Sequence, residues 1–475
     1  MVAICIVGGG PGGLLTAHHL LKKEPACNIT IYEATPDVGG KILTKHFKSA
    51  PAMFEAGVAE LYHPKKFEDS LLNLLKQFDF KFIKMAGDVA IYKGRIIPNI
   101  DALRNVVSES CWKNITQFIE LGKKYRSPEE FSSAGWPKDN QHPWANLTLR
   151  EVLDKHIPHE DAKNFFEKII KSDLATEPGV TNGTYGFDNY LVDEPDYCQI
   201  YTISTGISGL VDALTDELEG RCQVLVDTPV RSIRKLASEK YRVVSKNEEH
   251  LVTKEYDCII ICLPVQWLPS IDYVGTLRSL MSEHHSYYNY PAHYLRVACL
   301  FKRPFWQEYL GDGSYFRLDA FGGCCVYDES SRYPCPPYGV LNWLIAGSNA
   351  EAMSNLEDDL LITRTLESLP PELSILAKDN FLEGYVKRWI GTVNGQPGGL
   401  PLKDIKDKHL IDPKNHPHFI IVGDYLFDST LNGLMDSADI ASNLLLESLR
   451  TAGVLRKNPS RNYDLSPRVK NLMKR

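Results

Sequence analysis

The stretch ICIVGGGPGGLLTAHHLL, close to the amino end, constrains the fold more than any other part of the chain. The apolar run Val2–Val7 leads directly into glycines, which is typical of a buried strand in a parallel sheet. Gly8, Gly10 and Gly13 then follow the dinucleotide-binding spacing: a tight turn, close approach of a pyrophosphate, and close packing of helix on strand. Residues Gly12–Leu21 are predicted to form the helix whose positive end faces the phosphates. The sequence therefore predicts a dinucleotide site at this turn.

A second predicted strand, NITIYE, ends at Glu33, about twenty residues after the last glycine of the motif. A carboxylate is needed there to bind ribose hydroxyls, and an acid disfavours a ribose that carries a 2′-phosphate. The motif alone does not separate FAD from NAD.

Composition excludes several classes of protein. A chain of 475 residues is long for one core, so two domains are expected. Its net charge of −7 argues against a nucleic-acid binder, and no apolar run approaches the roughly 18 residues of a membrane span. The chain lacks the pattern of a signal peptide, and its 11 cysteines are scattered through mostly apolar segments, so we expect reduced thiols and a cytoplasmic location. The pair Cys324–Cys325 lacks the CxxC spacing of a zinc site, and no metal is predicted.

The segment YEATPDVGGKILT, Tyr32–Thr44, resembles the stretch after the second strand in the flavin amine oxidase superfamily. That group includes monoamine and polyamine oxidases, amino-acid oxidases, and carotenoid or porphyrinogen desaturases. Its members place Gly-Gly-Arg around the flavin diphosphate. Here Gly39, Gly40 and Lys41 keep the glycines and the charge but lose the two-pronged guanidinium of arginine.

Further similar stretches lie along nearly the whole chain: FEAGVAEL, TGISGLVDALTDEL, VLVDTPVRSIRK, YDCIIICLP, RVACLFKRPFW and FIIVGDYLFDSTLNGLMDSADIASNLL. The resemblance implies non-covalent FAD, with the last stretch placing a helix amino end at the N1–O2 edge of the flavin, where negative charge develops on reduction. It implies cofactor contacts at Gly8, Gly10, Gly12, Gly13, Glu33, Gly39, Gly40, Lys41, Val58, Val230, Gly423, Asp424, Gly433, Leu434, Met435 and Ala438, with Val230 on the adenine side.

The fold class that the resemblance implies is α/β, with a Rossmann-type FAD-binding domain interleaved with an α+β substrate domain. The expected FAD-binding domain comprises residues 1–85, 205–265 and 385–450, and the substrate domain 86–204 and 266–384. Residues 451–475 form a basic tail, with an amphipathic helix conceivable near 465–473 but a solvated tail expected.

Three residues are candidates for the substrate side of the site. Arg296 stands where amine oxidases usually have a lysine that holds a water near flavin N5; it could hold a water, grip a substrate anion, or be a salt-bridged strand arginine. Glu60 stands where amino-acid oxidases often have an arginine for the substrate carboxylate; it could attract a cation or cap the helix after Pro64. Trp389 stands where the family has a tryptophan near the flavin, or it packs in the core.

Two aromatic rings that cage the substrate nitrogen in many amine oxidases are not found at the corresponding positions. The loop after Trp389 has no aromatic residue, and the other position is Leu434. Tyrosines gathered in 185–201 and 287–294 suggest instead an aromatic cavity wall, although such clusters are more often core or interface.

The leading hypothesis is an FAD-dependent oxidoreductase that transfers a hydride from a small amine or amino-acid-derived metabolite to flavin N5, with O2 as the final acceptor. The alternatives are a C–C desaturase or isomerase on the same scaffold, and a non-catalytic FAD-binding protein. The sequence leaves a homodimer open and predicts no nucleic-acid partner.

Overall fold

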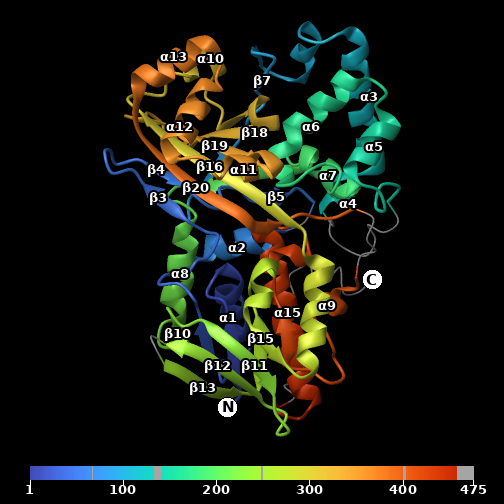
Figure 1. The fold of residues 1–475 in the computed structure, drawn as a ribbon, viewed down its shortest axis with the longest axis vertical. Helices are drawn as coiled ribbons and strands as arrows, with labels where there is room; N and C mark the ends of the chain where they lie inside the picture. The colour runs from blue at the N-terminus through green and yellow to red at the C-terminus, as the bar shows by residue number, and fades with distance from the viewer. Residues whose placement is uncertain (67, 133–141, 248–249, 399–402, 457–475) are drawn as a thin grey trace.

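The structure is a computed structural model that describes residues 1–66, 68–132, 142–247, 250–398 and 403–456. Figure 1 shows helices α1 and α15 in the lower half of the view and the long strands β16 and β20 in the upper half. The segment 465–473, for which a helix was considered, lies outside the described residues, as does most of the basic tail.

A parallel five-stranded sheet forms the centre of the lower half. Its strand order is β10-β2-β1-β14-β21, and every neighbouring pair is parallel. The strands are β1 (Ala3–Val7), β2 (Asn28–Tyr32), β10 (Gln223–Leu225), β14 (Cys258–Ile261) and β21 (Phe419–Ile421). The predicted buried strand before the glycines is confirmed as β1, which pairs with β2 on one side and β14 on the other. Parallel order brings the carboxyl ends of these strands to one edge, where ligands bind in such sheets.

Three helices cover this sheet: α1 (Pro11–Lys23), α8 (Ser208–Leu218) and α15 (Leu431–Thr451). Helix α1 confirms the prediction from the glycine motif, and it packs against both α8 and α15 (Figure 1). The core between helices and sheet is apolar on both sides, and Ile4, Ile6, Leu14 and Leu445 are fully buried in it.

A smaller four-stranded sheet, ordered β13-β12-β11-β15, lies beside the parallel one. Residues 240–263 contain the antiparallel pair β12 and β13, followed by β14. The elements of this part are β11 (Val230–Lys235), β12 (Tyr241–Asn247), β13 (His250–Tyr256), η3 (Val265–Ser270), β15 (Asp272–Val274) and α9 (Thr276–Tyr288).

The upper half is built on a seven-stranded sheet of order β20-β16-β19-β18-β17-β7-β8. Its strands are β7 (Ala90–Tyr92), β8 (Arg95–Ile97), β16 (Pro291–Phe301), β17 (Tyr315–Leu318), β18 (Cys324–Asp328), β19 (Gly339–Ala346) and β20 (Phe381–Asn394). The stretches PAHYLRVACLF and GVLNWLIA form β16 and β19, which pair antiparallel. The short helices that follow these strands are α10 (Gln307–Leu310), η4 (Ala320–Gly322), η5 (Glu329–Arg332), α11 (Gly347–Met353), α12 (Asp358–Glu367) and α13 (Pro371–Asn380).

A helical group stands beside this sheet, and α6 contacts β17, β18 and β19 (Figure 1). Its elements are η1 (Ile100–Asn105), α3 (Glu109–Tyr125), α4 (Pro128–Ser132), α5 (Leu149–His156), α6 (Glu160–Leu174) and α7 (Gly183–Leu191).

The remaining elements connect the two halves. They are β3 (Thr44–His46), β4 (Met53–Glu55), β5 (Leu61–Pro64), α2 (Ser70–Gln77), β6 (Phe82–Met85), β9 (Cys198–Ile203), α14 (Ile405–His409) and η6 (Asp424–Leu426). The two halves therefore alternate along the chain. The boundaries 1–85, 205–265 and 385–450 stay a prediction, and β20, through Asn394, is hydrogen-bonded to β16 in the upper sheet.

Among the helices of the described ranges, none combines the length and the hydropathy that crossing a membrane requires.

The β1–α1 turn tolerates no side chain at its third motif glycine. An ideal Cβ on Gly13 would lie 2.0 Å from the carbonyl oxygen of Gly8, so we expect Gly13→Ala to lower the thermal midpoint clearly, since overpacking against backbone costs roughly 1–3 kcal/mol or more. Gly179→Ala is the matched control, because a Cβ there meets nothing within 4 Å. Equal midpoints for the two variants would contradict the close contact.

Candidate active site

The glycine turn forms a cradle at the carboxyl edge of the parallel sheet. Gly8 has φ +110, a conformation that side chains rarely adopt, and helix α1 begins with no side-chain cap on its amino end. The N–H groups of its first turn therefore stay open to an anionic ligand. Gly40 approaches Gly10 so closely that a Cβ on Gly40 would lie 3.3 Å from the Cα of Gly10.

Glu33 lies at the end of β2, as the motif predicts. One carboxylate oxygen accepts the N–H of Gly9 at 2.8 Å, and the other accepts from the backbone N–H and the hydroxyl of Thr35. The backbone carbonyl of Glu33 accepts the N–H of Thr228, so the start of β11, at Val230, lies beside this end of the sheet. The acid, the glycine turn and Val230 thus share one edge.

Lys41 and Asp424 form an ion pair between the segment that follows β2 and η6. The two residues are 383 positions apart, and both line the cavity described below. The prediction treated them as separate contacts of one ligand; the structure shows that they also contact one another.

The amino end of α15 also points to this region. The Thr430 hydroxyl accepts the N–H of Gly433 at 3.0 Å, and the helix begins at Leu431. Leu434 packs close to the glycine turn, since a Cβ on Gly12 would lie 3.1 Å from a methyl carbon of Leu434. Further along the same helix, Met435 and Ala438 are buried. Gly423 lies between β21 and η6, where its N–H donates to Ser437.

A cavity of about 230 Å³ lies where the two halves meet. Of the residues singled out by sequence, its wall contains Lys41, Val58, Glu60, Arg296, Trp389, Asp424 and Leu434. The remaining predicted positions are not on this wall: they are the glycines of the turn and of the 39–40 pair, Glu33, Val230, Gly423, Gly433, Met435 and Ala438. The structure thus brings all three substrate-side candidates to one cavity.

Arg296 enters the cavity wall from strand β16. Its side chain is only 5% exposed, and its guanidinium lies over the ring of Tyr327, 5.1 Å from the centroid. The buried Nη1 has no hydrogen-bond partner, and no carboxylate of the described chain forms an ion pair with Arg296. Of the three alternatives for Arg296, the one in which it forms a salt bridge within the sheet is therefore not seen among the described residues.

Glu60 lies on the wall just before β5. Its carboxylate accepts the hydroxyl of Tyr62 at 2.5 Å. It does not cap the helix after Pro64, because α2 begins at Ser70 and is capped by Asp69, whose carboxylate accepts the N–H of Leu72. That structural alternative is wrong.

Asp173, on the last turn of α6, is a wall residue that the sequence reasoning missed. It forms an ion pair with Arg317 at 3.1 Å, and Arg317 pairs in turn with Asp193 at 2.6 Å. Burial raises the pKa of Asp173 to about 8; Arg317 opposes this shift, and the charges of Asp193 and Glu60 add to it. One feature of the sequence could have drawn attention to Asp173: an acidic residue in the last turn of a helix interacts unfavourably with the helix dipole.

Tyrosines complete the wall. Tyr62, Tyr185, Tyr294 and Tyr327 line the cavity, so both tyrosine-rich segments contribute to it. Trp389 is held by its indole N–H, which donates to the Ala56 carbonyl at 2.6 Å. The aromatic rings of this cavity therefore come from other elements than the two positions expected for a cage.

The model of the flavin containing amine oxidoreductase family matches residues 11–444. The chain belongs to this family. The predicted superfamily is thereby confirmed.

Comparisons with individual proteins agree with this assignment. Flavin-containing amine oxidase A from Sus scrofa is 23% identical over 38% of this chain and 33% of its own length, and the Equus caballus protein of that name is 22% identical over 54% and 48%. This chain therefore matches a third to a half of the length of these relatives.

Among solved structures, putrescine oxidase with putrescine bound has a TM-score of 0.71 at 16% identity, covering 94% of this chain and 99% of its own. Cyclohexylamine oxidase from Brevibacterium oxydans IH-35A has a TM-score of 0.70 at 16% identity, with the same coverage. A protein from Exiguobacterium sp. 255-15 described as a protoporphyrinogen oxidase has 0.67 at 17% identity, again over 94% and 99%. These likenesses confirm the predicted fold class.

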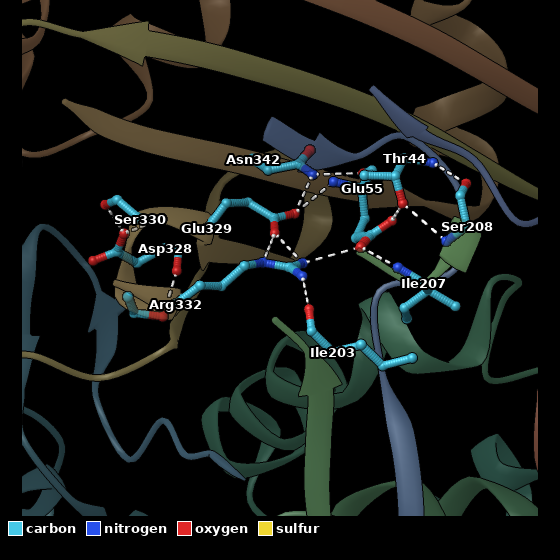
Figure 2. Close-up of polar contacts among 11 residues, drawn as sticks. Thr44, Glu55, Ile203, Ile207, Ser208, Asp328, Glu329, Ser330, Arg332 and Asn342 are labelled. Carbon is cyan, nitrogen blue, oxygen red and sulfur yellow. Dashed lines mark hydrogen bonds and ion pairs between the residues drawn. The ribbon is translucent and has the colours of Figure 1, made fainter. Parts of the chain in front are cut away.

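A buried polar network fixes the segment that leads to the cavity (Figure 2). Arg332 forms ion pairs with Glu329 at 2.6 Å and with Glu55 at 3.2 Å, and all three side chains are almost fully buried. Burial raises the pKa of Glu55; Arg332 opposes this shift and the Glu329 charge adds to it.

The same network holds the backbone of Glu55. Its N–H donates to Glu329 at 3.1 Å, and its carbonyl accepts from Asn342 at 2.8 Å (Figure 2). The Glu55 carboxylate accepts the N–H of Ile207, at the start of α8, and the hydroxyl of Thr44. Val58 and Glu60 therefore extend into the cavity from a fixed anchor.

The raised pKa of Asp173 predicts a specific pH dependence of stability. From about pH 4, the ordinary pKa of an aspartate, to about pH 8, the folded protein holds a proton that the unfolded chain has lost. The free energy of unfolding that this proton contributes therefore falls as pH rises across this range and is lost above about pH 8. We expect the thermal midpoint of Asp173→Asn, relative to the wild type, to increase between pH 5 and pH 8 and then level off.

The measurement is a series of thermal melts of both proteins from pH 5 to pH 9. Asp212→Asn, at an exposed position on α8, controls for the loss of one acidic side chain. A difference between Asp173→Asn and wild type that stays constant with pH would contradict the shift.

Proposed function

We propose that the protein is an FAD-dependent oxidoreductase that takes a hydride from a small amine or an amino-acid-derived metabolite and passes the electrons to O2. The observation that carries this proposal is a cavity, next to the flavin-family cradle, that contains carboxylates and an aromatic wall. A cationic amine is the substrate that buried carboxylates and tyrosine rings recognise.

The cradle fits a dinucleotide, and membership of the flavin-containing family makes FAD the proposed one. Its glycine turn leaves no room for a side chain at Gly13, and helix α1 has no side-chain cap, which suits a pyrophosphate. Glu33 lies where an adenosine ribose needs an acceptor. The residues that would hold FAD are these, together with the Gly39–Lys41 segment, Val58, Val230, Asp424 and the amino end of α15 at Gly433.

When bound, FAD supplies the two-electron chemistry, accepting hydride from the carbon next to nitrogen and delivering the electrons to O2. The residues of this chain orient the substrate and exclude water. In the proposal Glu60 attracts the amine, Arg296 contacts the opposite side of the substrate, and Trp389 packs beside the ring.

The absence of aromatic residues at position 434 and in the loop after Trp389 favours a second candidate function. Without aromatic residues there, the cavity lacks the pair of rings expected around an amine nitrogen, and a C–C desaturation or isomerisation on the same scaffold would not require them. The likeness to the Exiguobacterium protein described as a protoporphyrinogen oxidase is in keeping with this alternative.

A stopped-flow experiment under nitrogen separates the candidates. Amines that bind as cations should bleach the flavin absorbance, and Glu60→Gln should lower the apparent second-order rate constant of flavin reduction by them roughly 10- to 100-fold, the range expected for one charge-assisted contact. Glu372→Gln, on the surface helix α13, serves as the control and should leave the rate unchanged.

Each other outcome changes the assignment. Bleaching only by unsaturated-ring precursors, with a product two mass units lighter and no ammonia, would replace amine oxidation with desaturation. If no substrate pool bleaches the flavin while dithionite still does, the oxidase proposal fails and a non-catalytic flavoprotein takes its place.

A further inference from the structure

No described residue forms an ion pair with the guanidinium of Arg296. It is 5% exposed, its Nη1 is buried without a partner, and its one contact of note is the ring of Tyr327. An arginine stays charged at any ordinary pH, and a buried charge without an ion pair costs several kcal/mol. Such a group on a cavity wall indicates a ligand that supplies the missing acceptor.

The neighbouring tyrosines cannot supply a negative charge. Burial raises the pKa values of Tyr294 and Tyr327 well above the ordinary range, so both hydroxyls stay neutral. Glu60, Asp173 and Arg296 line the same cavity as these two tyrosines.

The two carboxyl groups are already engaged elsewhere. Glu60 accepts from Tyr62, and Asp173 is paired with Arg317. Neither forms an ion pair with Arg296 in the described residues. The cavity wall thus carries an open cationic site and, separately, an acidic site.

We propose that the substrate is an amino acid or a similar small amino-carboxylate, with its carboxylate bound by Arg296 and its amine directed to Glu60 and Asp173. This inference rests on the proposed function, and it makes Arg296 a specificity-determining residue. A guanidinium binds a carboxylate through two parallel hydrogen bonds, which fixes orientation as well as charge. A plain amine would satisfy only the acidic site.

Matched ligands that differ by one group at a time test the proposal. The first set is leucine, 3-methylbutylamine and 4-methylpentanoate, and the second is phenylalanine, 2-phenylethylamine and 3-phenylpropanoate. The deaminated acids have no C–N bond to oxidise, so the perturbation of the flavin absorbance spectrum under nitrogen measures their binding without turnover. The amines and amino acids are followed by bleaching in the same cuvette.

We expect the acids to bind the wild-type holoenzyme. In Arg296→Gln their Kd should rise roughly 10- to 100-fold, with Arg296→Lys in between. Arg303→Gln, just beyond the same strand and paired with Glu308 at the surface, controls for the loss of one positive charge. Flavin content and thermal midpoint are recorded for every variant, and Arg296→Lys carries the test if the glutamine variant does not fold.

The outcomes separate the two proposals. If amines bleach the flavin but no acid binds, or if acids bind wild type and both Arg296 variants equally, the Arg296 assignment is overturned while amine oxidation stands. If acids bind through Arg296 but neither amines nor amino acids bleach the flavin, the carboxylate site stands and the proposed oxidation fails.

Discussion

The ion pairs of Arg332 with Glu55 and Glu329 hold together the parts of the molecule that form the cavity. Arg332 belongs to η5, Glu55 ends β4, and the same cluster reaches the start of α8 and strand β19. Removing one partner of such a group leaves a buried charge uncompensated, so the three side chains stabilise one arrangement strongly. Residues 56–60 have no regular secondary structure, and this anchor gives them a defined course along the cavity.

The cofactor side and the substrate side of the site differ in how much the sequence reveals. The β1–α1 turn could be predicted because a buried strand, three glycines and a helix start are all local, and their physical requirements leave a fixed spacing. Glu33 follows from the same unit because β2 lies next to β1. Strands β12, β16 and β19 were also predictable, since each is a short apolar or alternating run between turns.

The substrate wall was harder because its residues come from elements far apart in the chain. Asp173 from α6, Arg296 from β16 and Tyr327 from β18 meet only through the packing of the upper sheet with the helical group. Whether Arg296 has an ionic partner, or whether Glu60 caps a helix, depends on such contacts and not on neighbours in sequence. The helix in question begins at Ser70, and the nearer Asp69 caps it, which leaves Glu60 for the cavity.

The missing pair of aromatic rings and the lack of an ion pair at Arg296 among the described residues have a common physical interpretation. A cage of two rings orients an amine through weak cation–π contacts, each worth about 0.5–2 kcal/mol. Charged groups on opposite sides of a substrate can orient it as well, and a carboxylate such as Glu60 keeps lone pairs for an amine while it accepts the Tyr62 hydroxyl. No N–H of the Arg296 guanidinium is hydrogen-bonded to an acceptor of the described chain. The larger gain in free energy on substrate binding therefore comes from the contact with Arg296. In this arrangement orientation depends on the distance between two charges, and rings at Leu434 or after Trp389 are no longer needed to define it.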